Sequence, residues 1–174
     1  MAALNLTIPI PKEASQFEDL VFDYAEDKLS PEAIQQYGKR GSGQSGIDHQ
    51  VRLVGGDWVG IQCKRYWDAK LTPTLLQKDL DAAHALQPAL TRYIVATTKS
   101  TQTDLQDWAR SATIHAQARV DIWFWEDIER WILVPTNLVQ YLPLPPAVLA
   151  ESLSIQLGNA KGSREIMAFC GHGD

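Results

Sequence analysis

Cysteine is scarce in this chain, which holds two in 174 residues, and no apolar run approaches the length of a membrane span. Cys63 falls in a predicted core strand and Cys170 lies near the end of the chain, so a disulfide framework is not expected. The first residues lack the basic region and long apolar stretch of a signal peptide. These absences predict a cytoplasmic protein with no membrane partner.

Two common kinds of ligand site are also missing. The four histidines and two cysteines are dispersed, without the spacing of zinc ligands. The glycine-rich segment 38–46 lacks the spacing of a nucleotide-binding P-loop, and a strand is predicted after it where a P-loop needs a helix. A net charge of −5 argues against coating nucleic acid through bulk charge. Local clusters of cations can still bind phosphate.

Periodicity along the chain predicts one α/β domain. Apolar residues recur at helical or strand spacing in alternating segments. The predicted elements are a helix at 15–29, a further helical turn at 31–34, strands at 48–53 and 59–64, a helix at 72–86, a strand at 93–98, a helix from 101 with a capping box of Thr101 and Asp104, a strand at 120–125 and a helix at 126–134. This order predicts a mixed central β-sheet flanked by helices. On the second helix, Leu75, Leu76, Leu80, Ala83 and Leu86 are expected to face inward.

The two strands at 48–53 and 59–64 are expected to form a hairpin around Gly55 and Gly56. A two-residue turn would set apolar residues against polar ones. A three-residue loop of Gly55, Gly56 and Asp57 matches the faces instead. It pairs Leu53 with Val59, Val51 with Ile61, Gln50 with Gln62 and Asp48 with Lys64. The register that buries the apolar face therefore gathers Asp48, Gln62 and Lys64 on the other.

These side chains suit phosphodiester chemistry. Asp48 is the natural anchor for Mg²⁺, which prefers oxygen ligands, and the backbone carbonyl of Cys63 and the carboxylate of Glu18 could add further oxygens. Lys64 could stabilise the negative charge that develops on an attacked phosphate. Asp48 alone is more often an exposed acid, and Glu18 could equally be a solvated helix residue.

The pattern of Gly46, Ile47 and Asp48, then a hairpin, then Gln62 and Lys64 resembles the PD-(D/E)XK nuclease superfamily, in particular its Mrr-like branch, where glutamine replaces the second acid. The resemblance covers residues 14–134 and extends over 17–21, 37–38, 60–66, 93–98 and 124–128. It implies a restriction-endonuclease-like core in residues 1–134. Residues 135–174 are expected to be a proline-containing linker or C-terminal extension, with a candidate helix at 147–157, leading to a domain absent from this chain.

The resemblance implies a metal-dependent DNA endonuclease, similar to the N-terminal effector nucleases of bacterial anti-phage proteins. Its implied catalytic residues are Asp48, Gln62, Lys64 and Glu18, and its implied metal ligands are Asp48, Glu18, Gln62 and Cys63. The implied cofactor is Mg²⁺, for which Mn²⁺ can substitute, and the implied partners are double-stranded DNA, further copies of the chain, and a fused or associated sensor or NTPase module. Predicted DNA contacts are Lys39, Arg40, Gln44, Arg52, Arg65 and Lys70, although such cations also form merely solvated faces.

Two departures from the family pattern bear on the site. Ile47 stands where the family has proline before the motif acid. Gln62 is neutral, so the site holds less negative charge than one with two strand acids. This favours one tightly held ion over two. The alternatives are a degenerate nuclease fold that binds DNA or mediates assembly, and a resolvase or modification-dependent restriction enzyme. Trp58 and Trp67 near the site are either core or cap residues, or surfaces that stack on a base.

Overall fold

The computed structural model describes residues 8–38, 45–115 and 117–141. The elements in chain order are α1 (Ala14–Leu29), β1 (Ala33–Gln36), β2 (His49–Arg52), β3 (Trp58–Lys64), α2 (Pro73–Ala83), β4 (Arg92–Thr97), α3 (Thr103–His115), β5 (Arg119–Trp123), α4 (Trp125–Ile132) and α5 (Pro135–Tyr141). The chain is thus an α/β fold with a five-stranded mixed sheet packed against helices. Within the described residues, no helix is long and apolar enough to span a membrane.

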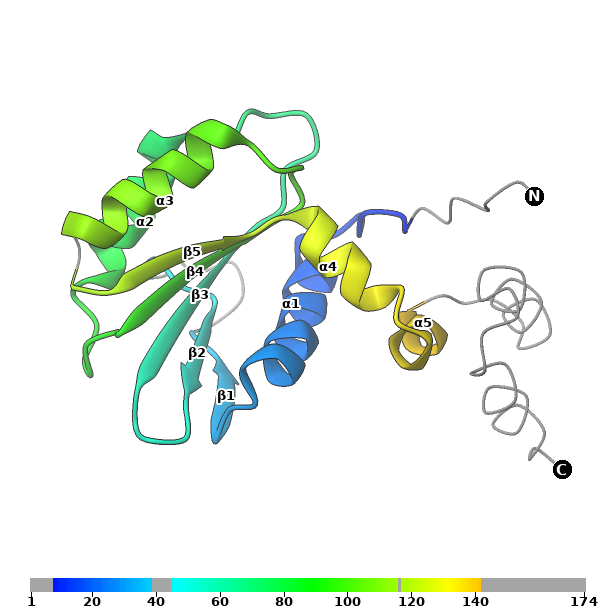
Figure 1. Cartoon of the computed structure of the whole chain (residues 1–174), viewed down its shortest axis with the longest axis horizontal. Coiled ribbons are helices and arrows are strands. Elements are labelled where there is room, and N and C mark those ends of the chain that lie inside the picture. Colours follow the sequence, from blue (N-terminus) through cyan, green and yellow to red (C-terminus); the bar gives the residue numbers. More distant parts are fainter. Residues whose placement is uncertain (1–7, 39–44, 116, 142–174) are drawn as a thin grey trace, which may run out of the picture. The chain divides into compact units, whose positions relative to one another are not determined.

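The sheet has the strand order β1-β2-β3-β4-β5 (Figure 1). The first three strands pair antiparallel, whereas β3, β4 and β5 run parallel to one another. Because β3 and β4 are parallel, their carboxyl ends lie at the same edge of the sheet. The start of β2 lies at that edge too, since β2 runs antiparallel to β3. This edge carries Asp48, Gln62 and Lys64, three of the predicted site residues.

Helices cover both faces of the sheet. Figure 1 shows α2 and α3 on one face and α1 on the other. The α2 and α3 side buries a continuous apolar cluster that includes Leu76, Leu80, Tyr93 and Leu105. On the other side, α1 buries its stripe of Phe17, Leu20, Val21, Tyr24 and Ala25, as its helical spacing predicts. The ring of Phe22 meets His49 of β2 edge-on, with centroids 5.7 Å apart.

The hairpin loop has the predicted length, but it begins one residue earlier. The N–H of Leu53 donates to the carbonyl of Asp57 at 2.9 Å, which leaves Val54, Gly55 and Gly56 as the loop. Gly55 and Gly56 have φ of 111° and 93°, values that favour glycine.

The observed register pairs Val51 with Val59 and Gln50 with Gly60. The predicted pairings of Leu53 with Val59, Val51 with Ile61, Gln50 with Gln62 and Asp48 with Lys64 are therefore wrong by two residues. A shift of two keeps every side chain on its predicted face, because side chains alternate with a period of two.

Residues 31–34 do not form the expected helical turn. Instead β1 pairs antiparallel with β2, so that Ile34 lies beside Val51. The N–H of Glu32 donates to the carbonyl of Arg52 at 2.9 Å, and the Glu32 carboxylate pairs with the Arg52 guanidinium at 2.8 Å. Pairing with β2 stabilises this short strand, although the stretch has little strand preference of its own.

Three other local expectations are corrected. Leu75 is 43% exposed and does not belong to the inward face of α2. No capping box forms at Thr101, since α3 begins at Thr103 and the Thr101 N–H donates to the Glu126 carboxylate. The segment after 134 contains α5, which its prolines did not suggest. The candidate helix at 147–157 and Cys170 lie outside the described residues.

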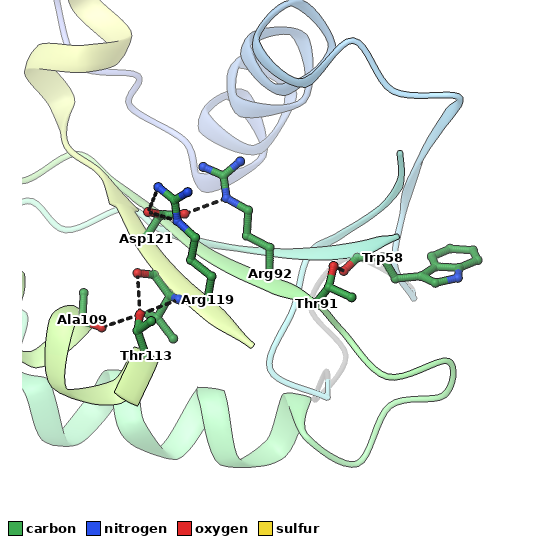
Figure 2. A network of polar contacts seen from close by, with 8 residues as sticks. Trp58, Thr91, Arg92, Ala109, Thr113, Arg119 and Asp121 are labelled. Carbon is green, nitrogen blue, oxygen red and sulfur yellow. Dashed lines mark hydrogen bonds and ion pairs between the residues drawn. The ribbon is translucent and has the colours of Figure 1, made fainter. Parts of the chain in front are cut away.

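Polar contacts secure the start of β4 and β5 (Figure 2). The carboxylate of Asp121 accepts from the Nε of Arg92 at 2.6 Å and from the guanidinium of Arg119 at 3.0 Å. At the outer edge of β5, the Thr113 hydroxyl accepts from the Val120 N–H at 2.8 Å. The Asp121 contact with Arg92 joins β5 to β4. The Thr113 contact satisfies the Val120 N–H at the edge of the described sheet.

The chain divides into two compact units. One unit is Ile10–Ile128, which contains the sheet with α1, α2 and α3; the other is Met1–Pro9 with Glu129–Asp174. Within the second unit, the ring of Trp131 lies 5.5 Å from that of Tyr141, and the side chain of Asn137 donates to the Trp131 carbonyl at 2.9 Å. All residues of the candidate site discussed below lie in the first unit. The predicted boundary between 134 and 135 stays a prediction.

Candidate active site

Asp48 and Gln62 meet at the edge of the sheet where β3 ends. The Nε2 of Gln62 lies 2.6 Å from the Oδ2 of Asp48, and the backbone N–H of Cys63 donates to the same oxygen at 2.7 Å. The Asp48 N–H donates to the carbonyl of Ile61 at 2.8 Å, which continues the hairpin pairing by one residue. Three bonds with β3 therefore hold Asp48, two of them through its carboxylate, and the residue is 8% exposed.

Alternation along the strands places the predicted site on one face of the sheet. Gln62 and Lys64 stand beside Val95 and Thr97 of β4, and Val95 packs in the apolar cluster under α2 and α3. His49 and Cys63 have the opposite parity and face α1. Asp48, Gln62 and Lys64 thus share one face of the sheet, as predicted, although by a different register. That α2 covers this face was not predicted.

Lys64 finds its charged partner on a helix. Its Nζ lies 2.6 Å from the Oδ2 of Asp79 on α2, and the two side chains are 19% and 24% exposed. The sequence reading did not single out Asp79. A signal was present, because Asp79 lies three residues after Leu76 and four before Ala83, on the buried stripe of α2. A carboxylate on a buried stripe requires a partner.

A close backbone contact brings α2 against the segment before Asp48. Gly46 has φ of +77°, and a Cβ at this position would overlap the backbone carbonyl oxygen of Asp79. The hydroxyl of Tyr93 donates to the carbonyl of Gly46 at 2.9 Å. Only glycine permits this approach. Gly46 and Tyr93 therefore set the distance between the helix that carries Asp79 and the residue Asp48.

Burial dominates the electrostatics of the site. Desolvation raises the pKa of Asp48, and the negative charge of Asp79 adds to this, while the Cys63 N–H, the Lys64 ammonium and the Gln62 amide oppose it. Desolvation also raises the pKa of Cys63 well above its usual value. The pKa of Tyr93 is raised by burial and then by Asp79 and Asp48. The Cys63 thiol and the Tyr93 hydroxyl therefore stay neutral, and neither group is activated as a nucleophile.

The donor set at Asp48 fits a hard cation. The Nε2 of Gln62 lies between two oxygens, since it is also 3.4 Å from the carbonyl of Cys63. An N–H donor between two oxygens occupies the kind of position that a cation takes. The oxygen and nitrogen ends of an amide are assigned from hydrogen bonds alone, so the Gln62 side chain can equally be placed with its ends exchanged. Its oxygen would then take this position and add a third oxygen to the site. One carboxylate with two neutral oxygens is a ligand set that Mg²⁺ accepts.

Acidic side chains do not form a metal cluster in the parts of the chain that the structure describes. No group of three or more His, Cys, Asp or Glu residues there is placed to hold an ion. Glu18 lies on α1, where its carbonyl contacts the Nε2 of His49 at 3.1 Å, and its charge contributes to the raised pKa of Cys63. Its role as ligand and catalytic residue stays a prediction.

The predicted DNA contacts divide into three sets. Lys39, Arg40 and Gln44 lie outside the described residues. Arg52 pairs with Glu32 at the far end of β2, about 13 Å along the strand from Asp48. Arg65 directly follows Lys64, and its Nε donates to the carbonyl of Pro11 at 2.8 Å, while Lys70 is exposed. The structure therefore brings Arg65, but not Arg52, to the edge that carries Asp48.

No protein-family model matches the sequence, and no curated protein is significantly similar to it.

Proposed function

We propose that this chain is a metal-dependent DNA endonuclease with a restriction-endonuclease-like core of the PD-(D/E)XK type, Mrr-like branch. The observation that carries the proposal is the 2.6 Å contact between Gln62 and Asp48, on the same face as Lys64. Apolar packing alone does not require a buried carboxylate and amide at a sheet edge, because burying such groups is costly unless they have partners. A metal-dependent hydrolytic site uses such groups as oxygen ligands for its ion.

Each residue has a distinct task in this proposal. Asp48, the carbonyl of Cys63 and the side chain of Gln62 would hold Mg²⁺, which supplies Lewis acidity and activates water for attack on phosphorus. Lys64 provides a positive charge that stabilises the extra negative charge of the attacked phosphate. Asp79 holds the Lys64 ammonium in place through their 2.6 Å ion pair. Glu18 is the candidate for a further acid on the α1 side.

The wider role follows from the same resemblance. We propose double-stranded DNA as the substrate, with Mn²⁺ able to replace Mg²⁺. Because one site cuts one strand, cleavage of both strands requires a homo-oligomer or successive visits. A cytoplasmic effector of anti-phage defence, activated by a fused or associated sensor or NTPase module, is the proposed setting.

One observation favours a second candidate, a degenerate nuclease fold that binds DNA or mediates assembly. Asp48 is bonded to Gln62, and Lys64 is paired with Asp79, so each charged group already has a protein partner. An enzyme must exchange these contacts for contacts to metal and substrate. A module that only binds DNA or mediates assembly can keep these contacts unchanged.

Incubation of the purified protein with supercoiled plasmid, single-stranded DNA and RNA, each with Mg²⁺, Mn²⁺ or EDTA, separates the two functions. We expect nicked and linear plasmid with either metal and none with EDTA. Retained, metal-independent binding of DNA without any cleavage would favour the degenerate module. A substrate panel of branched and methylated DNA extends the same assay to the resolvase and modification-dependent alternatives.

A further inference from the structure

Trp67 presents an exposed aromatic ring three residues after Lys64. Trp67 is 61% exposed, and every other Phe, Tyr or Trp among positions 8–38, 45–115 and 117–141 is buried or half-buried. A large exposed indole beside a candidate active site suits stacking contact with a ligand.

The backbone that carries Trp67 is firmly held. The Lys64 carbonyl accepts from the Thr97 hydroxyl at 2.9 Å and from the Thr98 N–H at 3.3 Å. The Thr98 hydroxyl accepts from the Tyr66 N–H at 2.9 Å, and the Lys99 ammonium donates to the Trp67 carbonyl at 3.3 Å. The segment after β3 is thus fastened along the end of β4. Little backbone freedom remains to be lost when Trp67 binds a partner.

A cation lies over the same ring. The guanidinium carbon of Arg65 is 5.7 Å from the centroid of the Trp67 ring system. Within the part of the chain that the structure describes, Arg65 bonds to Pro11 through its Nε alone, so its two terminal nitrogens remain as donors for phosphate. Aromatic rings and cations side by side are the combination that binds single strands, because the ring stacks on a base while the cation holds the backbone.

We propose that Trp67 and Arg65 form a stacking platform for an unpaired base of a DNA strand whose phosphate lies at Lys64. This inference rests on the proposed nuclease function. Three residues span at most about 10 Å, so the ring is within a few nucleotides of the phosphate. In an intact duplex both faces of each base are already stacked. The platform therefore favours single-stranded, frayed or flipped nucleotides over intact duplex.

Binding without cleavage tests the platform. Fluorescence anisotropy in EDTA would compare a labelled single-stranded oligothymidylate with a blunt duplex of the same length. Trp67→Ala should weaken single-strand binding by roughly 10-fold and leave duplex binding about unchanged, since stacking contributes about 1–3 kcal/mol per base. Trp67→Phe should retain most of the affinity. Ile114→Ala removes another exposed apolar side chain, 75% exposed on α3, and serves as the matched control.

Several results would overturn the platform. These are unchanged single-strand binding by Trp67→Ala, equal losses on both substrates, or no binding of single strands by the wild type. Quenching of tryptophan fluorescence by the oligothymidylate, present in the wild type and lost in Trp67→Phe, provides a second readout that does not depend on Trp67→Ala. Failure of the nuclease proposal would appear separately, as absence of Mg²⁺-dependent cleavage while these binding differences remain.

Discussion

The ammonium group of Lys64 lies 2.6 Å from the carboxylate of Asp79, so a residue of the hairpin is paired with a residue of α2 across the edge of the sheet. Both side chains are largely shielded from water, and an ion pair of this kind restrains its members more than a surface pair does. The position of the proposed catalytic lysine thus depends on how α2 packs.

Asp79→Asn should reduce kcat for DNA cleavage by about 10-fold with little change in KM, because it removes the charge that positions Lys64 but keeps the side-chain size. Steady-state cleavage of a labelled oligonucleotide gives both constants. Asp81→Asn is the matched control, since Asp81 is an exposed acid on the same helix. Equal losses in the two variants would show that charge on α2, and not the contact with Lys64, matters.

Asp48→Ala and Lys64→Ala should each lower plasmid cleavage by at least about 100-fold, because each removes a group that acts on the reacting phosphate or its metal. Circular dichroism and melting curves would verify that both variants fold. Asp57→Asn, an exposed acid at the end of the hairpin loop, should cleave like the wild type. Persistent cleavage by both alanine variants would rule out the proposed site.

Asp48→Asn should increase the free energy of unfolding at neutral pH while it abolishes cleavage. Burial raises the pKa of Asp48 in the folded protein, so the fold disfavours its charged form. The favourable contribution of this carboxyl is complete below its unfolded pKa and is lost as pH rises through its folded pKa. Asparagine avoids the loss and can still accept bonds from Gln62 and Cys63.

The sign of this effect can be checked by urea denaturation at several pH values. The stability difference between Asp48→Asn and the wild type should be largest at neutral pH and should shrink as pH falls toward the unfolded pKa, about 3.9. A variant that is less stable than the wild type at neutral pH would show that bonds to the charged carboxylate outweigh its desolvation.

Gly46→Ala should destabilise the fold by about 3–5 kcal/mol, because its Cβ would overlap the Asp79 carbonyl and its φ is positive. Gly56→Ala is the matched control: its φ of 93° is also positive, but no atom of the described residues lies within 4 Å of the added carbon. Its cost should be only about 1–2 kcal/mol. Similar values for the two variants in urea denaturation would remove the argument for a close contact.

Addition of Mg²⁺ should raise the melting temperature of the wild type, because a ligand that binds only the folded state stabilises it. EDTA should reverse the change. Asp48→Ala should melt at the same temperature with and without Mg²⁺, whereas Asp57→Asn should respond like the wild type. A shift of equal size in Asp48→Ala would place any bound ion elsewhere.

Local pattern was sufficient for most helices and strands of this chain. The apolar stripe of α1 and the alternation of β2 and β3 each depend on one segment and its own periodicity. The sequence pattern did not predict the strand β1. Residues 33–36 have little strand preference of their own and form a strand because they pair with β2. The hairpin register was misjudged for a related reason. Loops starting at Val54 or at Gly55 satisfy the same alternation.

By itself the sequence determined which side chains share a face, and so it predicted that Asp48, Gln62 and Lys64 lie together. The reason is geometric: a period of two survives an error of two residues in register. Only the tertiary structure decided that Gln62 bonds Asp48, that Asp79 holds Lys64, and that Gly46 lets α2 approach. The first of these contacts depends on the register of the hairpin, and the other two depend on how α2 packs against the sheet.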